Sequence, residues 1–250
     1  MAGHSKWAQI KRKKGATDAK RGQAFSKLSR AIIVASREGG ADPAGNLALQ
    51  NAIEKAREAS MPKENIERAI ARGSGAGADG SSYEAVTYEG YGPAGVALYV
   101  EALTDNRNRT AADVRHVFAK HDGNLGESGS VAWLFERKGV VLVSGEADED
   151  ELMLAAADAG AEDVEADGTS FSVTAPTDAL AAVREALERE GFEVESSELT
   201  MLPKTTVAIE DEAAARKLVR LVEALEENDD VQDVYANFDI PERVLEAAAS

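Results

Sequence analysis

The stretch Asp163-Val-Glu-Ala-Asp-Gly-Thr-Ser-Phe-Ser-Val-Thr174 decides the fold of the second half of this chain. An Asp-Gly pair between residues that alternate apolar and polar is a strong signal for a β-hairpin. We therefore expect a strand around Val164, a tight turn at Asp167-Gly168 and a second strand over Phe171–Thr174. The same residues begin like a calcium-binding loop, but its twelfth position would be Thr174, which cannot supply the bidentate carboxylate. The stretch predicts a hairpin rather than a calcium site.

Helices and single strands are predicted on both sides of this hairpin. The expected helices are Asp148–Ala159 and Thr177–Glu190, and the expected outer strands are Val140–Val143 and Phe192–Glu198. In chain order the segment reads strand, helix, strand, strand, helix, strand, which is the ferredoxin-like order. The sequence thus predicts a ferredoxin-like α+β domain over residues 137–204.

Neither of the segments that flank this domain has enough helices and strands to form a domain by itself. Before it we expect strands at Tyr83–Glu89, Val96–Leu103 and Val131–Phe135, and a helix at Asn108–His121. After it we expect a helix at Asp211–Glu227 and a strand at Val231–Phe238. Together these elements could complete one unit. We therefore predict a discontinuous α+β middle domain, residues 81–136 plus 205–240, with the ferredoxin-like domain inserted in it.

The first part of the chain is predicted to be helical. Apolar side chains recur every three or four residues, as on one face of a helix, at Phe25, Leu28, Ile32 and Ala35. This helix should begin after Thr17 or Asp18 and stop at Gly39-Gly40. Asp42-Pro43 should begin a second helix, with Asp42 as its N-cap, and Pro62 a third. The fold class is therefore α/β, of the α+β kind, with three domains: residues 1–75 and the two described above.

Charge is distributed very unevenly along the chain. Residues 1–75 hold 15 Lys and Arg against 7 Asp and Glu, a net charge of +8. The remaining residues hold 13 against 38, a net charge of -25, so the whole chain carries -17. Such asymmetry suggests two surfaces with different partners. A basic module can bind a polyanion while the acidic part faces away, because salt screens exposed charges beyond roughly 10 Å.

Several classes of function are disfavoured by composition. The chain has no cysteine, which removes disulfides, thiolate catalysis and Cys-based zinc sites. His4, His116 and His121 are its only imidazoles and show no metal-binding spacing, so we expect no metal and no cofactor. No pair of acids stands out for general acid–base work, so we expect no catalytic residues. No apolar run is long enough for a bilayer, and the basic start has no apolar segment behind it, so we expect a cytoplasmic protein without membrane contact.

A dense group of basic residues lies beside a tryptophan at the start of the chain. Phosphate backbones attract such groups because each neutralised phosphate releases counterions, and an exposed Trp can stack on a base. The alternative is a solubilising helix face behind a disordered tail. We favour nucleic-acid binding by an arm and the helix after it. The candidate residues are Lys6, Trp7, Lys11, Arg12, Lys13, Lys14, Lys20, Arg21, Lys27 and Arg30.

Arg107 and Arg109 form a second basic island, where the rest of the chain is acidic. Two arginines at a helix N-terminus are a plausible phosphate site. Alternatively, Asn106 or Asn108 caps the helix and the arginines pair with nearby acids. The sequence alone leaves both interpretations open.

Five motifs in order resemble the YebC family. They are Met1-Ala-Gly-His-Ser-Lys-Trp7, Met61-Pro-Lys-Glu-Asn-Ile-Glu-Arg-Ala-Ile70, Tyr88-Glu-Gly-Tyr-Gly-Pro-Ala-Gly95, Leu103-Thr-Asp-Asn-Arg-Asn-Arg-Thr110 and Gly123-Asn-Leu-Gly-Glu-Ser-Gly-Ser-Val131. The resemblance implies three domains, a helical one followed by two α+β domains, one inserted in the other. It implies a cytoplasmic, non-catalytic DNA-binding regulator of transcription. The alternative that it implies is a ribosome- or RNA-associated translation factor, a translational activator that relieves stalling at proline runs and contacts ribosomal or transfer RNA.

The resemblance also bears on individual residues and partners. The basic arm and first helix match the family, whereas the roles of the Gly90–Gly95 loop and of Arg107 and Arg109 stay unassigned. We expect nucleic acid as the main partner, with a protein partner possible on the acidic domains. The sequence does not choose between DNA and RNA, name a target or give the oligomeric state.

Overall fold

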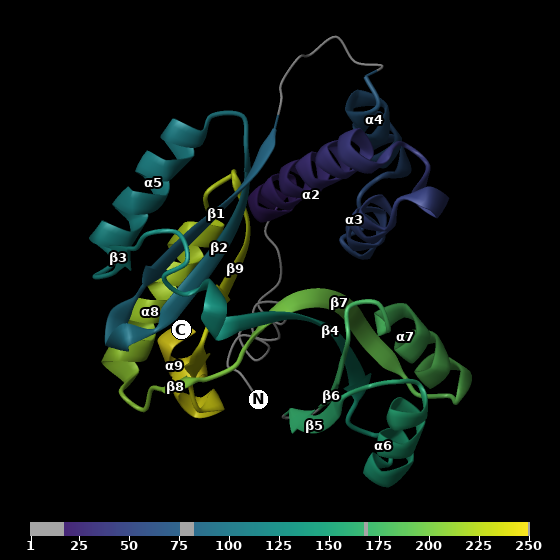
Figure 1. Cartoon of the computed structure of the whole chain (residues 1–250). Helices are drawn as coiled ribbons and strands as arrows, with labels where there is room; N and C mark the ends of the chain where they lie inside the picture. Colours follow the sequence, from purple (N-terminus) through teal and green to yellow (C-terminus); the bar gives the residue numbers. More distant parts are fainter. Residues whose placement is uncertain (1–17, 76–82, 168–169, 250) are drawn as a thin grey trace.

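The computed structural model describes residues 18–75, 83–167 and 170–249 of the 250-residue chain. A group of N-terminal helices lies beside two separate four-stranded antiparallel sheets, each with helices of its own (Figure 1). The predicted fold class is thereby confirmed. None of the helices in the described segments is both long and apolar enough to cross a membrane.

The N-terminal unit contains three α-helices, α2 (Asp18–Gly39), α3 (Leu47–Glu58) and α4 (Lys63–Gly73). The predicted apolar stripes meet in one core that includes Ile32, Leu49, Ile53 and Ile66. Gly40 follows α2 with φ +90°, a conformation that favours glycine, so the helix ends where the sequence indicated.

The predicted start of the second helix was wrong. Asp42 caps only a short 3-10 turn, η1 (Pro43–Gly45), and the α-helix begins four residues later. Asn46 is the true N-cap of α3, because its side chain accepts a hydrogen bond from the Leu49 N–H at 3.1 Å. Asn46 is also buried and donates to the carbonyls of Ala35 and Gly40, so it joins two helices.

The first sheet has the strand order β3-β1-β2-β9 and combines distant parts of the chain. Its strands are β1 (Glu84–Tyr91), β2 (Ala97–Thr104), β3 (Asn124–Leu125) and β9 (Val231–Ala236). Because β9 pairs antiparallel with β2, the segment after the inserted unit returns to the sheet that precedes it. The exact bounds of the middle domain stay a prediction.

Helices cover one face of this sheet and bury its largest core. They are α5 (Arg107–Lys120), α8 (Glu212–Glu226) and α9 (Glu242–Ala249). The predicted stripe of α8, from Leu218 to Leu225, is fully buried in this core. Helix α9 and a short parallel pair, β8 (Val207–Ala208) with β10 (Phe238–Asp239), were not predicted.

The segment that leads from the first sheet to the second packs on the opposite face of the first sheet. The predicted strand Val131–Phe135 was wrong, because this segment forms a 3-10 turn, η3 (Ala132–Leu134). The N–H groups of Val131 and Ala132 bond the carboxylate of Glu89 and are thus unavailable to a neighbouring strand. Val131 and Phe135 remain buried against Ala97 and Tyr235 of the sheet.

The second sheet has the order β5-β6-β4-β7 with all pairs antiparallel, which is the ferredoxin-like arrangement. Its strands are β4 (Phe135–Ser144), β5 (Asp163–Asp167), β6 (Ser170–Ala175) and β7 (Val194–Pro203). Helices α6 (Glu149–Asp158) and α7 (Leu180–Arg189) pack on one face, as Figure 1 shows. The predicted order of elements is therefore observed.

Candidate nucleic-acid interface

Most of the predicted binding residues lie at or before the start of α2. Lys6, Trp7, Lys11, Arg12, Lys13 and Lys14 are outside the described residues. Lys20 is in the first turn of α2, and Arg21, which follows it, is exposed. The binding role of this group stays a prediction.

Two other predicted residues of α2, Lys27 and Arg30, contact the end of α8 instead of facing away from it. The Lys27 ammonium donates to the carbonyl of Glu226, and Arg30 donates to the carbonyl of Asp229. Gln23 adds bonds to the Glu227 carbonyl and the Asp229 side chain. A helix C-terminus carries a partial negative charge and unpaired carbonyls, so cations stabilise it. These contacts join the basic helix to the acidic part of the chain.

Asp230 is the centre of this junction. Its side chain is buried, and Arg30 donates to Oδ1 at 2.9 Å while Arg109 donates to Oδ2 at 2.8 Å. The hydroxyls of Thr104 and Thr110 also bond Oδ2, at 3.3 and 2.6 Å. A buried charge is tolerated where it is paired and hydrogen-bonded in this way.

The pKa of Asp230 reflects the same balance. Burial would by itself raise the pKa, because desolvation disfavours the charged form. Hydrogen bonds from Arg109 and Thr110, with the charges of Arg109 and Arg30, outweigh burial and hold the pKa below its ordinary value. Asp230 is therefore an ionised carboxylate that links α2, α5 and the turn before β9.

The second basic island takes part in this junction. Asn106 caps α5 by accepting from the Arg109 N–H at 3.1 Å, and Arg109 pairs with both Asp105 and Asp230. Arg107 is more exposed, with Glu84 3.9 Å away. The structure thus contains the cap and the ion pairs of the second interpretation. A phosphate role for Arg107 and Arg109 stays a prediction.

The basic character of α5 and the role of Asp230 were not predicted from the sequence. Helix α5 also exposes Arg115, His116 and Lys120, with Asp113 as its one acidic residue, so it is a basic helix in an acidic region. This excess was visible in the sequence. The role of Asp230 was not, because its partner Arg30 lies 200 residues away along the chain.

The structure also bears on catalytic alternatives. Within the described ranges, no three His, Asp or Glu side chains gather where they could hold a metal ion. Burial raises the pKa of Glu101, but this carboxylate accepts hydrogen bonds from Arg137 and, at 3.5 Å, from the Tyr235 hydroxyl. These hydrogen bonds give the Glu101 carboxylate a structural role in the packing of the sheet face.

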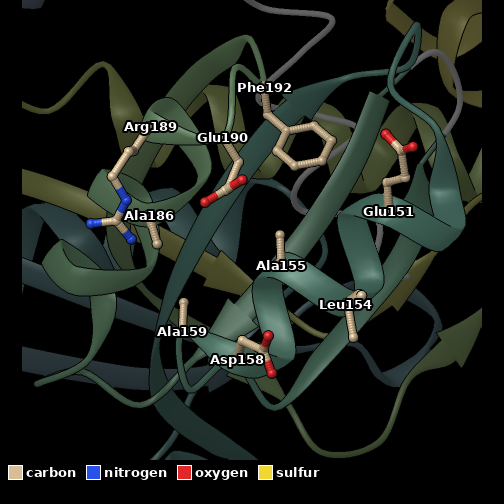
Figure 2. Close-up of a pocket in the computed structure, with 9 residues that line it drawn as sticks. All are labelled: Glu151, Leu154, Ala155, Asp158, Ala159, Ala186, Arg189, Glu190 and Phe192. Atoms are coloured by element: carbon tan, nitrogen blue, oxygen red, sulfur yellow. The ribbon is translucent and has the colours of Figure 1, made fainter.

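An open groove of about 510 Å³ lies between α6 and α7, beside Phe192. Figure 2 shows that its carboxylates, on Glu151, Asp158 and Glu190, point to different sides and do not converge on one point. Catalytic carboxylates need to converge on a reacting atom. This groove therefore offers no support for acid–base chemistry.

Comparison with known proteins identifies the family. A model described as the TACO1/YebC protein N-terminal domain matches residues 5–76, and one for the TACO1/YebC second and third domain matches residues 83–238.

Full-length relatives agree with this assignment. A protein of Rubrobacter xylanophilus named "Probable transcriptional regulatory protein" is 60% identical over 250 residues, covering 100% of both chains. A protein of the same name from Natranaerobius thermophilus is 53% identical, covering 98% of this chain and 99% of its own. The crystal structure of a conserved hypothetical protein from Aquifex aeolicus is 52% identical with a TM-score of 0.79, covering 90% of this chain and 92% of that one. Since two family models together cover most of the sequence, this chain belongs to the TACO1/YebC family.

Proposed function

We propose that this protein is a non-catalytic, cytoplasmic, DNA-binding regulator of transcription. The observation that carries the proposal is the full-length similarity to relatives named as probable transcriptional regulatory proteins, up to 60% identical. The charge distribution supports it independently, because the net charge of +8 over residues 1–75 suits a phosphate backbone.

The contacts of α2 support separate roles for its cations, some of which join the two parts of the chain while others bind phosphate. Lys27 and Arg30 bond the end of α8 and Asp230, which holds the basic unit against the acidic one. We assign the phosphate contacts to the cations of the arm, together with the exposed Arg21. The acidic part repels the same polyanion and thereby orients the molecule, and it offers a separate surface to protein partners.

The salt dependence of duplex DNA binding tests this proposal. If about six cations touch phosphates, a plot of log K against log salt should have a slope near -5. Replacing Lys11, Arg12, Lys13 and Lys14 with Ala should flatten the slope by about 3 to 4, because about 0.9 of a counterion is released per contact. An unchanged slope would exclude the arm from the interface.

A matched control removes the same charge elsewhere. Four exposed arginines of the acidic part can be replaced with Ala: Arg189, Arg216, Arg220 and Arg243. This variant should keep the wild-type slope. Parallel titrations with transfer RNA and ribosomes address the RNA alternative: tighter binding there than to duplex DNA at physiological salt would overturn the assignment to transcription.

A further inference from the structure

Two exposed aromatic side chains bond one backbone carbonyl near the end of strand β1 in the first sheet. Trp133 is 65% exposed and Tyr91, the last residue of β1, is 38% exposed. The Trp133 indole N–H donates to the Ser130 carbonyl at 3.1 Å, and the Tyr91 hydroxyl donates to the same oxygen at 3.2 Å. Their polar atoms are thus satisfied within the protein, while the rings keep surface in contact with solvent.

The segment that carries Trp133 is held by a buried charge. Glu89 is 5% exposed, and its carboxylate accepts hydrogen bonds from the N–H groups of Gly129, Val131 and Ala132 at 2.7 to 2.8 Å. Burial would raise the pKa of Glu89, but these three hydrogen bonds lower it below its ordinary value. An ionised carboxylate removed from water is costly, so its bonds to one short loop fix that loop firmly.

Packing of the residues on either side of Trp133 holds its segment further. Val131 and Phe135, on either side of η3, are buried against the sheet, and the Phe135 ring lies 6.0 Å from that of Tyr99. A segment held this way, with both rings hydrogen-bonded to Ser130, loses little conformational entropy when a ligand binds, which favours affinity.

A cation lies next to this site. The Lys204 N–H bonds the carbonyl of Leu134, the residue after Trp133. Lys204 is exposed to solvent. An exposed aromatic surface on a segment joined to an exposed lysine offers partners for the two parts of a nucleotide, its base and its phosphate.

We propose that Tyr91 and Trp133 form a stacking site for an unpaired nucleobase, and that Lys204, whose backbone bonds the residue after Trp133, supplies the cation for the adjoining phosphate. This inference rests on the proposed function, which it extends from phosphate binding by the arm to base binding on the middle domain. It also assigns a role to two sequence motifs, because Tyr91 belongs to the Gly90–Gly95 loop and the Gly123–Val131 segment supports Trp133. The bases of an intact duplex are already stacked, so the site takes a single-stranded or splayed segment.

The test uses Trp133 fluorescence in a Trp7→Phe background, where Trp133 is the one remaining tryptophan. A single-stranded oligothymidylate is compared with an abasic oligonucleotide of the same length and phosphate count, and anisotropy gives both affinities. We expect the oligothymidylate to quench Trp133 and the abasic strand to leave it unchanged. Stacking on an aromatic ring predicts roughly 5- to 150-fold weaker binding of the abasic strand.

Variants separate stacking from other effects. Trp133→Ala should weaken oligothymidylate binding by a similar factor and leave abasic binding unchanged, while Trp133→Phe should retain most of the affinity. Leu154→Ala, at another exposed apolar side chain, is the matched control and should bind like the parent protein. Far-ultraviolet circular dichroism checks that each variant is folded.

The possible failures are distinguishable. Equal affinities for the two oligonucleotides without quenching would overturn the stacking site and leave the proposed function standing. Equal loss of both affinities in Trp133→Ala would also overturn it, because the ring would then act on phosphate binding or on structure. Binding to neither strand, nor to duplex DNA or RNA, would overturn the proposed function itself.

Discussion

Replacement of Asp230 with Asn should weaken the junction between the basic helical unit and the first sheet. Asp230 is 4% exposed and receives hydrogen bonds from two arginines and two threonines. Asn has nearly the same shape, but it removes the negative charge and presents N–H groups to partners that are themselves donors. Arg30 and Arg109 would lose the carboxylate that holds them.

The expected magnitude follows from the burial of the Asp230 carboxylate. Removing one partner of a buried ion pair costs about 3–5 kcal/mol. In a chain of this size 1 kcal/mol corresponds to about 2–4 °C in Tm, so the loss should be about 6–20 °C. Asp229→Asn is the matched control: it removes the same charge one residue away, but the Asp229 side chain is exposed and its bond from Gln23 is 3.3 Å long. Its effect should stay within about 0.5 kcal/mol.

The pH dependence gives a second, independent check. The pKa of Asp230 is lower in the folded state than its ordinary value, so its contribution is complete above that value, about 3.9, and is lost as the pH falls through the folded pKa. The difference in Tm between wild type and Asp230→Asn should therefore be constant near neutral pH and shrink below about pH 4.

Differential scanning calorimetry between pH 7 and pH 3 measures both effects, and hydrogen exchange locates the loosened segment. The amides of α2 and of the first turns of α5 should exchange faster in Asp230→Asn. If Asp230→Asn and Asp229→Asn lowered Tm equally at pH 7, the stabilising role assigned to the buried carboxylate would be refuted.

Three further substitutions test close packing, the Glu89 loop and the helix cap. Gly73→Ala should destabilise the helical unit by about 1–3 kcal/mol in chemical denaturation, because a Cβ would lie 2.5 Å from the Ile33 carbonyl oxygen; Gly22→Ala, in open space within α2, should instead gain about 0.5–1 kcal/mol. Glu89→Gln should cost about 1–3 kcal/mol, because an amide cannot accept all three N–H bonds, and Trp133 emission should shift as the loop loosens; an unshifted spectrum would contradict this. Asn46→Ala should lower the free energy of unfolding in urea by about 1 kcal/mol or more, because it removes the N-cap of α3. An unchanged unfolding midpoint would instead indicate that Asp42 is the N-cap.

Local patterns predicted the elements well where one face of each element is apolar. The stripe of α8 and the hairpin signal at Asp167-Gly168 both depend on residues within a few positions of one another. The ferredoxin-like arrangement followed from their order, since few topologies satisfy that order. The errors at Asp42 and at Val131–Phe135 arose where a competing partner, Asn46 or Glu89, decided the local backbone.

The sequence by itself determined the helices and strands, their order, the basic first unit and the acidic remainder, because periodicity and charge are local properties. Tertiary structure alone decided that Lys27 and Arg30 bond the end of α8, that Asp230 joins α2 to α5, and that Glu89 holds the loop before Trp133. Those interactions join residues 40 to 200 positions apart, and the bonds to the buried carboxylates are strengthened by the low dielectric of their surroundings. Burial of that kind exists only once the chain has folded.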